Sequence, residues 1–253
     1  MPLYALRIEY DGAPFAGWQR QDGQRTVQQT IEEAAAALNG GTVPGSIVAG
    51  RTDAGVHASG QVAQVELAAT LPPVRVREAI NVRTRPLPVS VTGAALAPEG
   101  WNARFSAVLR GYRYRILNRH ARPALEGGRA WHVPRPLDAG AMATAAQGLL
   151  GRHDFSAYRA SSCQARDAWR TLDRLEVTRD GEVVEIVAEA RSFLHHQVRN
   201  LVGTLVQVGL GKQPVGWPRA VLDSRDRTLA GQTAPPDGLC LRFVRYPEEP
   251  CWE

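Results

Sequence analysis

Polar and hydrophobic residues alternate at the start of the chain and then recur with the spacing of a helix. Leu6, Ile8 and Tyr10 alternate with charged residues, which predicts a half-buried strand. Thr26 is a residue type that caps helices, and the apolar positions after it keep helical spacing until Gly40, a residue type that ends them. The pattern therefore predicts a strand followed by a helix. The apolar helical positions are Val27, Ile31, Ala34, Ala35 and Leu38.

The same reading predicts four further elements in the first part of the chain. They are strands at 46–49, 61–67 and 89–96 and a helix at 74–82. The predicted order is β-α-β-β-α-β.

A similar order recurs in the second part of the chain. The predicted elements are a strand at 108–117, a helix at 138–150, strands at 170–177 and 182–188, helices at 195–208 and 216–223, and a strand at 239–246. The middle strands flank the turn at 179–181, whose Asp-Gly pair favours a hairpin. We therefore predict an α+β fold of two ferredoxin-like halves, at 1–105 and 106–253, with antiparallel sheets side by side and a groove between them.

Composition narrows the class of protein. The chain has 253 residues, of which 44% are hydrophobic and 22% charged, as in a soluble globular protein. The chain lacks a run of about 18 apolar residues, so we expect no membrane span. The alternation at 1–11 also differs from a signal peptide.

Charge and cysteine usage add to this picture. The formal net charge of +5 favours a polyanionic partner, although the dominance of arginine over lysine can equally record a GC-rich genome. Cys163, Cys240 and Cys251 have neither metal-ligand nor disulfide spacing. We therefore expect a reducing cytoplasm and no zinc.

The stretch "GRTDAGVH" at 50–57 is the first candidate for chemistry. It follows a predicted strand, and two glycines flank Arg51 and Asp53. Functional side chains are commonly displayed on such loops, and an ionised carboxylate can act as nucleophile, base or ion-pair partner. The alternative is an ordinary turn with a solvated aspartate.

Two further stretches carry candidate residues. On the strand at 108–117, Arg110, Tyr112 and Tyr114 share one face, which suits base stacking beside phosphates unless the tyrosines belong to the core. On the helix at 195–208, Arg199 lies at the edge of a broad apolar stripe. An arginine there either extends its guanidinium to solvent or has a fixed partner. The neighbouring histidines at 195–196 suit a structural role better than metal binding.

The common cofactor and hydrolase motifs are missing from the chain: GxSxG, HExxH, the Walker loop and GxGxxG. A second catalytic carboxylate, which a glycosidase needs, does not stand out. An enzyme with this sequence is therefore expected to work with one carboxylate and without a cofactor.

Six motifs in order resemble the tRNA pseudouridine synthase A family. They are "FAGWQRQ" at 15–21, "AGRTDAGVHA" at 49–58, "FSAVLRGYRY" at 105–114, "CQARDAWRTL" at 163–172, "HHQVRNLVG" at 195–203 and "GLCLRFVRY" at 238–246. They span nearly the whole chain, which makes the resemblance specific.

The resemblance implies that the protein isomerises uridine to pseudouridine at positions 38 to 40 of the tRNA anticodon stem-loop. The N1–C1′ bond breaks, the uracil turns, and C5 bonds to C1′. Such an isomerisation requires neither cofactor nor metal. The resemblance further implies an RNA-binding groove between the halves and a homodimer that binds one tRNA across both subunits.

Site residues follow from the matching positions. Asp53 corresponds to the family's nucleophile, which can act on the sugar C1′ or on uracil C6. Tyr112 corresponds to the tyrosine that packs on the target base and can help remove the C5 proton. Arg199 corresponds to the basic partner of the aspartate, and Arg51 to the arginine that flips the base and contacts tRNA. The matches to tRNA-contact stretches are Arg104, Phe105, Cys163, Gln164 and Arg166.

Two departures and two competing hypotheses remain. Gln197 stands where a methionine is common, and the stretch ending at Leu71 and Pro72 lacks a basic contact that relatives can carry. A non-catalytic RNA-binding protein of the same fold would explain the basic charge and Tyr112 but not the Asp53 loop or Arg199. An inactive relative would be expected to have lost the aspartate or the tyrosine, and both are present.

Overall fold

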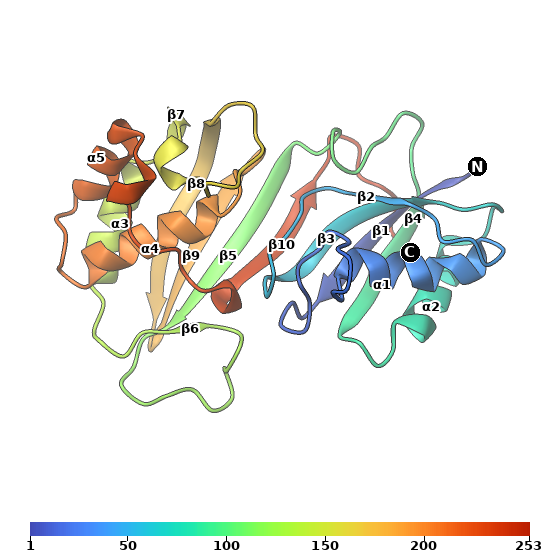
Figure 1. Ribbon diagram of the computed structural model, residues 1–253, viewed down its shortest axis with the longest axis horizontal. Helices are drawn as coiled ribbons and strands as arrows, with labels where there is room; N and C mark the ends of the chain where they lie inside the picture. The colour runs from blue at the N-terminus through green and yellow to red at the C-terminus, as the bar shows by residue number, and fades with distance from the viewer. The chain divides into compact units, whose positions relative to one another are not determined.

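A computed structural model describes all residues from 1 to 253. The chain forms two compact units (Figure 1). Unit 1 comprises Met1–Leu109 and Leu241–Glu253, and unit 2 comprises Arg110–Cys240. The boundary between the two halves was predicted between residues 105 and 106, whereas unit 1 gives way to unit 2 after Leu109. The structure differs at the C-terminal end, which belongs to unit 1.

Hydrogen bonds explain why the C-terminal segment belongs to unit 1. The Tyr246 hydroxyl donates to the Ala103 carbonyl at 2.7 Å, and its ring packs on Trp101 with 4.9 Å between centroids. Further along, the backbone N–H of Glu253 donates to the Ala94 carbonyl at 2.9 Å. These partners lie far upstream in the chain, which is why local sequence patterns do not reveal them.

Unit 1 combines an antiparallel sheet with two helices. Its elements are β1 Leu3–Tyr10, α1 Val27–Ala35, β2 Ser46–Val48, β3 His57–Glu66, α2 Pro73–Thr84, β4 Val89–Leu96 and most of β10 Leu239–Arg245. The strands are ordered β4-β1-β3-β10, and β2 pairs with β3. Helices α1 and α2 contact each other beside this sheet (Figure 1).

The strand and helix predicted at the start of unit 1 are present in the structure. Leu6, Ile8 and Tyr10 are buried in β1. The Thr26 side chain accepts a hydrogen bond from the Gln29 N–H at 3.3 Å and so caps α1, as predicted. The element order of this unit up to β4 is β-α-β-β-α-β.

Unit 2 combines four antiparallel strands and one short parallel strand with three helices. Its elements are β5 Leu109–Leu117, β6 Trp131–His132, α3 Ala139–Gln147, β7 Gly151–Asp154, β8 Trp169–Asp180, β9 Val183–Ala190, α4 Gln197–Gly209 and α5 Trp217–Ser224. The strands are ordered β5-β9-β8-β7, with β6 parallel to β5. Short 3-10 helices lie at Ala36–Leu38 in unit 1 and at Ser156–Tyr158, Arg227–Leu229 and Pro236–Gly238 in unit 2.

Unit 2 is more elaborate than a repeat of unit 1. The strands β6 and β7 were not predicted, because β6 has two residues and β7 has the polar sequence Gly-Arg-His-Asp. Alternation cannot be recognised in such short or polar segments. The α+β class agrees with the prediction, whereas the ferredoxin-like description of the halves stays a prediction.

Helix α4 supplies much of the core of unit 2. Val198, Leu201, Val202, Leu205 and Val206 are all buried, so the predicted apolar stripe is confirmed.

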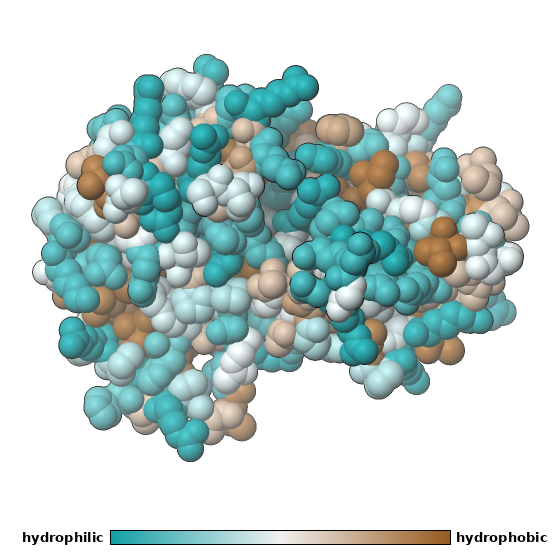
Figure 2. Space-filling view, in the orientation of Figure 1, coloured by the Kyte–Doolittle hydropathy of each residue, from teal (hydrophilic) through white to brown (hydrophobic).

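None of the helices combines the length and the apolar character that a membrane span requires. On the face shown in Figure 2, hydrophilic residues predominate and hydrophobic ones form small separate groups.

Candidate active site

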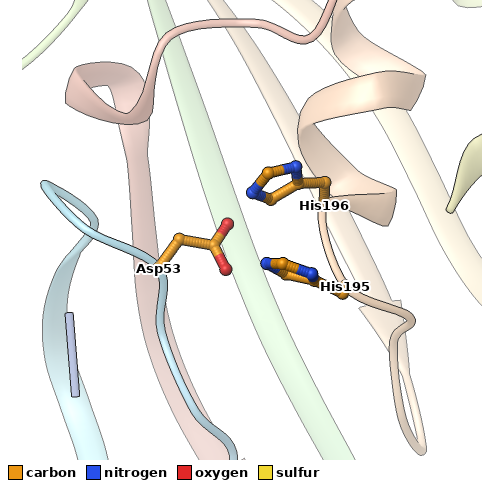
Figure 3. Close-up of side chains that lie close together, drawn as sticks. All are labelled: Asp53, His195 and His196. Atoms are coloured by element: carbon orange, nitrogen blue, oxygen red, sulfur yellow. The ribbon is translucent and has the colours of Figure 1, made fainter. Parts of the chain in front are cut away.

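Asp53 lies in unit 1 on the loop between β2 and β3 (Figure 3). Its side chain is half-buried, whereas Arg51 is exposed. Thr52, between them, points inward and is buried. The Thr52 hydroxyl forms a 2.7 Å hydrogen bond with the Tyr10 hydroxyl at the end of β1. The loop is therefore anchored at its centre, with the two candidate side chains on either side of the anchor.

The segment of residues 12–18 forms a backbone support for this loop. The Trp18 N–H donates to the Thr52 carbonyl at 3.0 Å, and the Gly55 N–H donates to the Phe15 carbonyl at 3.3 Å. Gly17 has φ +97°, and a Cβ there would lie 2.8 Å from the Thr52 carbonyl oxygen. A side chain at this position would be strained and would collide with the loop.

Gly12 makes an even closer approach at the other end of the loop. A Cβ on Gly12 would lie 2.1 Å from the Val56 carbonyl oxygen. The Gly12 N–H donates to Nδ1 of His57 at 3.0 Å, so Nδ1 lacks the proton in the neutral ring. The same Nδ1 lies 3.1 Å from Oδ1 of Asp11. His57 thus ties β3 to the residues that follow β1.

The sequence did not identify this supporting set, although it contained a signal. The motif at 15–21 was recognised only as part of the resemblance, and it includes Gly17 and Trp18, which contact the Asp53 loop. Tyr10, Thr52 and His57 were assigned no role. They act through contacts with residues distant in sequence, which local patterns do not reveal.

A second candidate position in unit 1 is the turn that follows Trp101. Oδ1 of Asn102 accepts hydrogen bonds from the N–H groups of Arg104 and Phe105, at 2.9 and 3.0 Å. Phe105 is 74% exposed, and the Arg104 guanidinium lies over its ring, 5.5 Å from the ring centroid. The turn displays an aromatic ring and a cation on a fixed backbone, which is a suitable surface for nucleic acid.

In unit 2, Tyr112 and Tyr114 both lie on β5 but have different surroundings. Tyr112 is half-buried and packs edge-to-face on Phe193, with 5.2 Å between ring centroids. Tyr114 is fully buried, and its hydroxyl donates to the Pro235 carbonyl at 2.7 Å. Burial raises the pKa of Tyr114, against the opposing effect of the Arg199 charge. Tyr114 is therefore a core residue, as the alternative hypothesis held.

Arg110, the third member of that face, is also buried. Arg110 is only 8% exposed, and its Nη1 donates a hydrogen bond to the Arg191 carbonyl at 2.5 Å. Stacking on bases or binding of phosphate at an open surface is thus not available to Arg110 in this conformation. Of the three residues, Tyr112 alone keeps a partly exposed side chain.

Arg199 lies in the first turns of α4 and has a fixed partner. Its Nε donates to the Ala234 carbonyl at 2.7 Å, and the Ala234 N–H donates back to the Arg199 carbonyl at 3.1 Å. The first of these bonds holds the guanidinium at its Nε, and the second holds the Ala234 backbone on the helix. This arrangement agrees with the fixed-partner alternative for an arginine at the edge of a buried helix.

The histidines before α4 occupy a strained turn. His196 has φ 61°, in the left-handed region that a residue with a side chain rarely adopts. The rings of His195 and His196 lie 4.1 Å apart, and Figure 3 shows both on the segment leading into α4. Neither unit by itself holds three His, Cys, Asp or Glu side chains close enough together to bind one metal ion.

The loop containing Cys163, Gln164 and Arg166 is joined to this turn. The Ala160 N–H donates to the His195 carbonyl at 2.9 Å, and Ser162 Oγ lies 3.2 Å from Nδ1 of His195. Cys163 is half-buried, whereas Gln164 and Arg166 are exposed. Unit 2 therefore brings the predicted contact loop to the turn before α4, and Phe193, the partner of Tyr112, precedes the same turn.

Comparison with known proteins identifies the family. A family model described as tRNA pseudouridine synthase matches residues 145–247. The chain is 61% identical to tRNA pseudouridine synthase A of Acidiphilium cryptum (strain JF-5) over 251 residues, which cover 99% of this chain and 98% of that protein.

Other relatives agree over a similar length. The protein of the same name from Paramagnetospirillum magneticum is 57% identical over 97% of this chain and 96% of its own. That of Rhodospirillum rubrum is 53% identical over 98% of this chain and 89% of its own. The chain therefore belongs to the tRNA pseudouridine synthase A family, whose members are isomerases, as its six motifs predicted.

Proposed function

We propose that the protein converts uridine to pseudouridine at positions 38 to 40 of the tRNA anticodon stem-loop, without a cofactor. The observation that carries this proposal is a half-exposed Asp53 on a loop held by buried contacts, in a chain 61% identical over 99% of its length to a tRNA pseudouridine synthase A. The reaction breaks the N1–C1′ bond and forms a C5–C1′ bond. The proton on C5 is released, and N1 gains one.

Asp53 is the nucleophile in this proposal. Covalent catalysis by a carboxylate requires a group that is held in place and open to its substrate. The Thr52 anchor and the backbone contacts of Gly12 and Gly17 supply the first condition, and the partial exposure of Asp53 supplies the second. Attack at the sugar C1′ and attack at uracil C6 both satisfy this role.

Arg51 is proposed to support entry of the target base. A stacked uridine must leave the stem-loop before a protein carboxylate can reach it, and this costs a few kcal/mol. The Arg51 guanidinium is exposed on the same loop as Asp53, so it is available to fill the vacated space. The Arg104 and Phe105 turn is proposed as a further tRNA contact.

Tyr112 and Arg199 of unit 2 are proposed to serve the same reaction. Tyr112 offers a partly exposed ring supported by Phe193, which suits packing on the target base. Arg199 offers a guanidinium held at its Nε, which suits the role of partner to the aspartate. The loop with Cys163, Gln164 and Arg166 is proposed to contact tRNA. In this proposal the protein is a homodimer.

Tritium release from tRNA transcribed with C5-tritiated uridine tests the reaction. The wild type is expected to release tritium without added cofactor, since C5 loses its hydrogen when it becomes the glycosidic carbon. Asp53→Asn is expected to lower the rate by at least about 1,000-fold. Asp22→Asn, at an exposed position of the same unit, is the matched control and is expected to react at the normal rate.

Filter binding of tRNA to the same proteins separates the alternatives. Binding by Asp53→Asn is expected to stay within about threefold of wild type, because the substitution hardly changes side-chain volume. Tight binding without tritium release by the wild type would instead favour a non-catalytic RNA-binding protein. Primer-extension mapping of pseudouridine tests the positions, and sedimentation tests the dimer.

A further inference from the structure

Helix α4 buries a stripe of polar side chains. Gln197, Asn200 and Thr204 are spaced by three and four residues and are all at most 1% exposed. Buried polar groups need hydrogen-bond partners inside the protein. For Asn200 and Thr204 several of those partners come from the segment of residues 227–233, which contains none of the motifs found in the sequence.

Arg227 is the centre of this arrangement. Its guanidinium donates to the Gly231 carbonyl, to Oδ1 of Asn200 and to Oγ1 of Thr233, each at 3.0 Å. All three acceptors are neutral. A half-buried cation is usually paired with a carboxylate. The Arg227 guanidinium instead joins one neutral oxygen of α4 to two neutral oxygens of residues 231–233, which points to a geometric role.

Two glycines bring the segment into backbone contact with α4. A Cβ on Gly203 would lie 1.7 Å from the Gln232 carbonyl oxygen, and a Cβ on Gly231 would lie 2.6 Å from the Gly203 carbonyl oxygen. The Gly231 N–H also donates to the Thr204 hydroxyl at 3.1 Å. The segment therefore rests directly on the helix backbone, and Arg227 holds it there.

The residues that directly follow this segment, Ala234 and Pro235, accept hydrogen bonds from Arg199 and Tyr114. The Ala234 carbonyl accepts from Nε of Arg199 at 2.7 Å, one residue after Thr233. The next carbonyl, that of Pro235, accepts from the Tyr114 hydroxyl at 2.7 Å. The position of the Arg199 guanidinium thus depends on where residues 231–235 lie, and Arg227 sets the start of that segment.

We infer that Arg227 is a positioning residue for Arg199, acting through Asn200, Thr233 and the carbonyl of Ala234. This inference rests on the proposed function of Arg199. Loss of the Arg227 fork leaves the Asn200 and Thr233 oxygens with fewer donors and releases the segment from the helix. The Ala234 carbonyl then moves, and the Arg199 guanidinium moves with it.

The first experiment compares Arg227→Gln and Arg227→Lys with Arg225→Gln. Arg225 is the matched control, because its side chain is 62% exposed and its ion pair is with Asp154, outside the network. Arg227→Gln is expected to lower kcat by roughly 100-fold with KM for tRNA nearly unchanged, as a displacement of about 1 Å at a catalytic group does. Arg227→Lys keeps the charge but not the fork and is expected to recover only a small part of kcat.

A double-mutant cycle tests the route of the effect. If Arg227 acts through Arg199, the variant carrying both Arg227→Gln and Arg199→Lys will be no slower than Arg199→Lys alone. Rate losses that multiply would overturn the inference, because Arg227 would then act elsewhere. Thermal melting of each variant shows whether loss of the folded state accounts for a lower rate.

Arginine Nε–H NMR provides a readout that needs no turnover. The Arg199 resonance is assigned by its disappearance in Arg199→Lys. It is expected to shift in Arg227→Lys and to stay in place in Arg225→Gln. An unmoved resonance in a folded Arg227→Lys protein would overturn the inference even if the proposed reaction were absent. A shifted resonance without tritium release by the wild type would leave the positioning intact and overturn only the proposed reaction.

Discussion

Asp53 lies on a loop of unit 1, and Arg199 lies on a helix of unit 2. Different kinds of hydrogen bond hold the two places. The Asp53 loop is supported largely by backbone hydrogen bonds, such as that from the Trp18 N–H to the Thr52 carbonyl. Around Arg199 the neighbouring segment is held mainly by side chains, with Arg227 and Asn200 at the centre. Glycines allow close approach in both places.

The difference follows from where backbone groups are already used. A loop has backbone donors and acceptors to offer, whereas a helix has bonded most of its own to residues four positions away. A segment that packs on a helix must therefore form its hydrogen bonds with side chains or with the second lone pair of a helix carbonyl. The Ala234 N–H does the latter when it donates to the Arg199 carbonyl. Adding a methyl group at a glycine should therefore damage both sites, whereas removing polar side-chain atoms should damage the helix site more than the loop.

Among these variants the largest effect is expected for Gly12→Ala, in the segment of residues 12–18 that supports the Asp53 loop. The new methyl group would lie 2.1 Å from the Val56 carbonyl oxygen, so the backbone must move. We expect a loss of about 3 kcal/mol in the free energy of unfolding, measured by urea denaturation. Gly45→Ala is the control, because a Cβ there meets nothing within 4 Å. Equal stabilities of the two variants would refute the close contact.

Asn200→Ala is expected to have a similar or slightly smaller effect in unit 2. It removes the acceptor of Arg227 and Thr233 and the donor to the Tyr158 carbonyl, which lies at 2.8 Å. Leaving these buried groups without partners should cost about 2–3 kcal/mol in urea denaturation. Asn39→Ala, whose hydrogen bonds are exposed, should cost less than about 1 kcal/mol. A neutral Asn200→Ala would contradict the side-chain network.

Thr52→Val should have a smaller effect on the loop. The substitution keeps the shape of the side chain and removes its 2.7 Å hydrogen bond with Tyr10. Backbone bonds still hold the loop, so we expect a loss of about 1 kcal/mol in stability. A double-mutant cycle with Tyr10→Phe should give a coupling energy of similar size. Independent effects of the two substitutions would show that this bond does not anchor the loop.

The smallest effect is expected for Gln197→Met in α4. Oε1 of Gln197 accepts from the Leu194 N–H at 2.8 Å, but its buried Nε2 has no hydrogen-bond partner. Removing a useful acceptor together with an unsatisfied donor should change stability by less than about 1 kcal/mol. Urea denaturation beside Asn200→Ala measures this directly. A loss as large as that of Asn200→Ala would mean that the Leu194 bond dominates this turn.

The sequence predicted the local elements well where the pattern was long and regular. The Thr26 cap and the buried stripe of α4 are confirmed. The hairpin predicted around residues 179–181 is also present, with its turn at 181–182 because Arg179 and Asp180 belong to β8. The family and its class of enzyme are also confirmed, because whole motifs were matched in order. Caps, turns and periodicity depend on residues only a few positions apart, and such information is local.

The candidate site shows where local information ends. Tyr112 and Tyr114 share one face of a predicted strand, yet one is half-buried and the other is in the core. Which of them keeps an exposed edge depends on Phe193 and Pro235, more than 70 residues away in the chain. Strand periodicity assigns a face but not what covers each position along it.

By itself the sequence determined the α+β class, most of the helices and strands, and the family. Only the tertiary structure decided which residues support Asp53, that Leu241–Glu253 belongs to unit 1, and that Arg227 holds the segment bound to Arg199. The reason is physical. Helices and strands satisfy their backbone groups over short distances or in regular pairs, whereas each buried polar side chain must find a partner wherever packing places one.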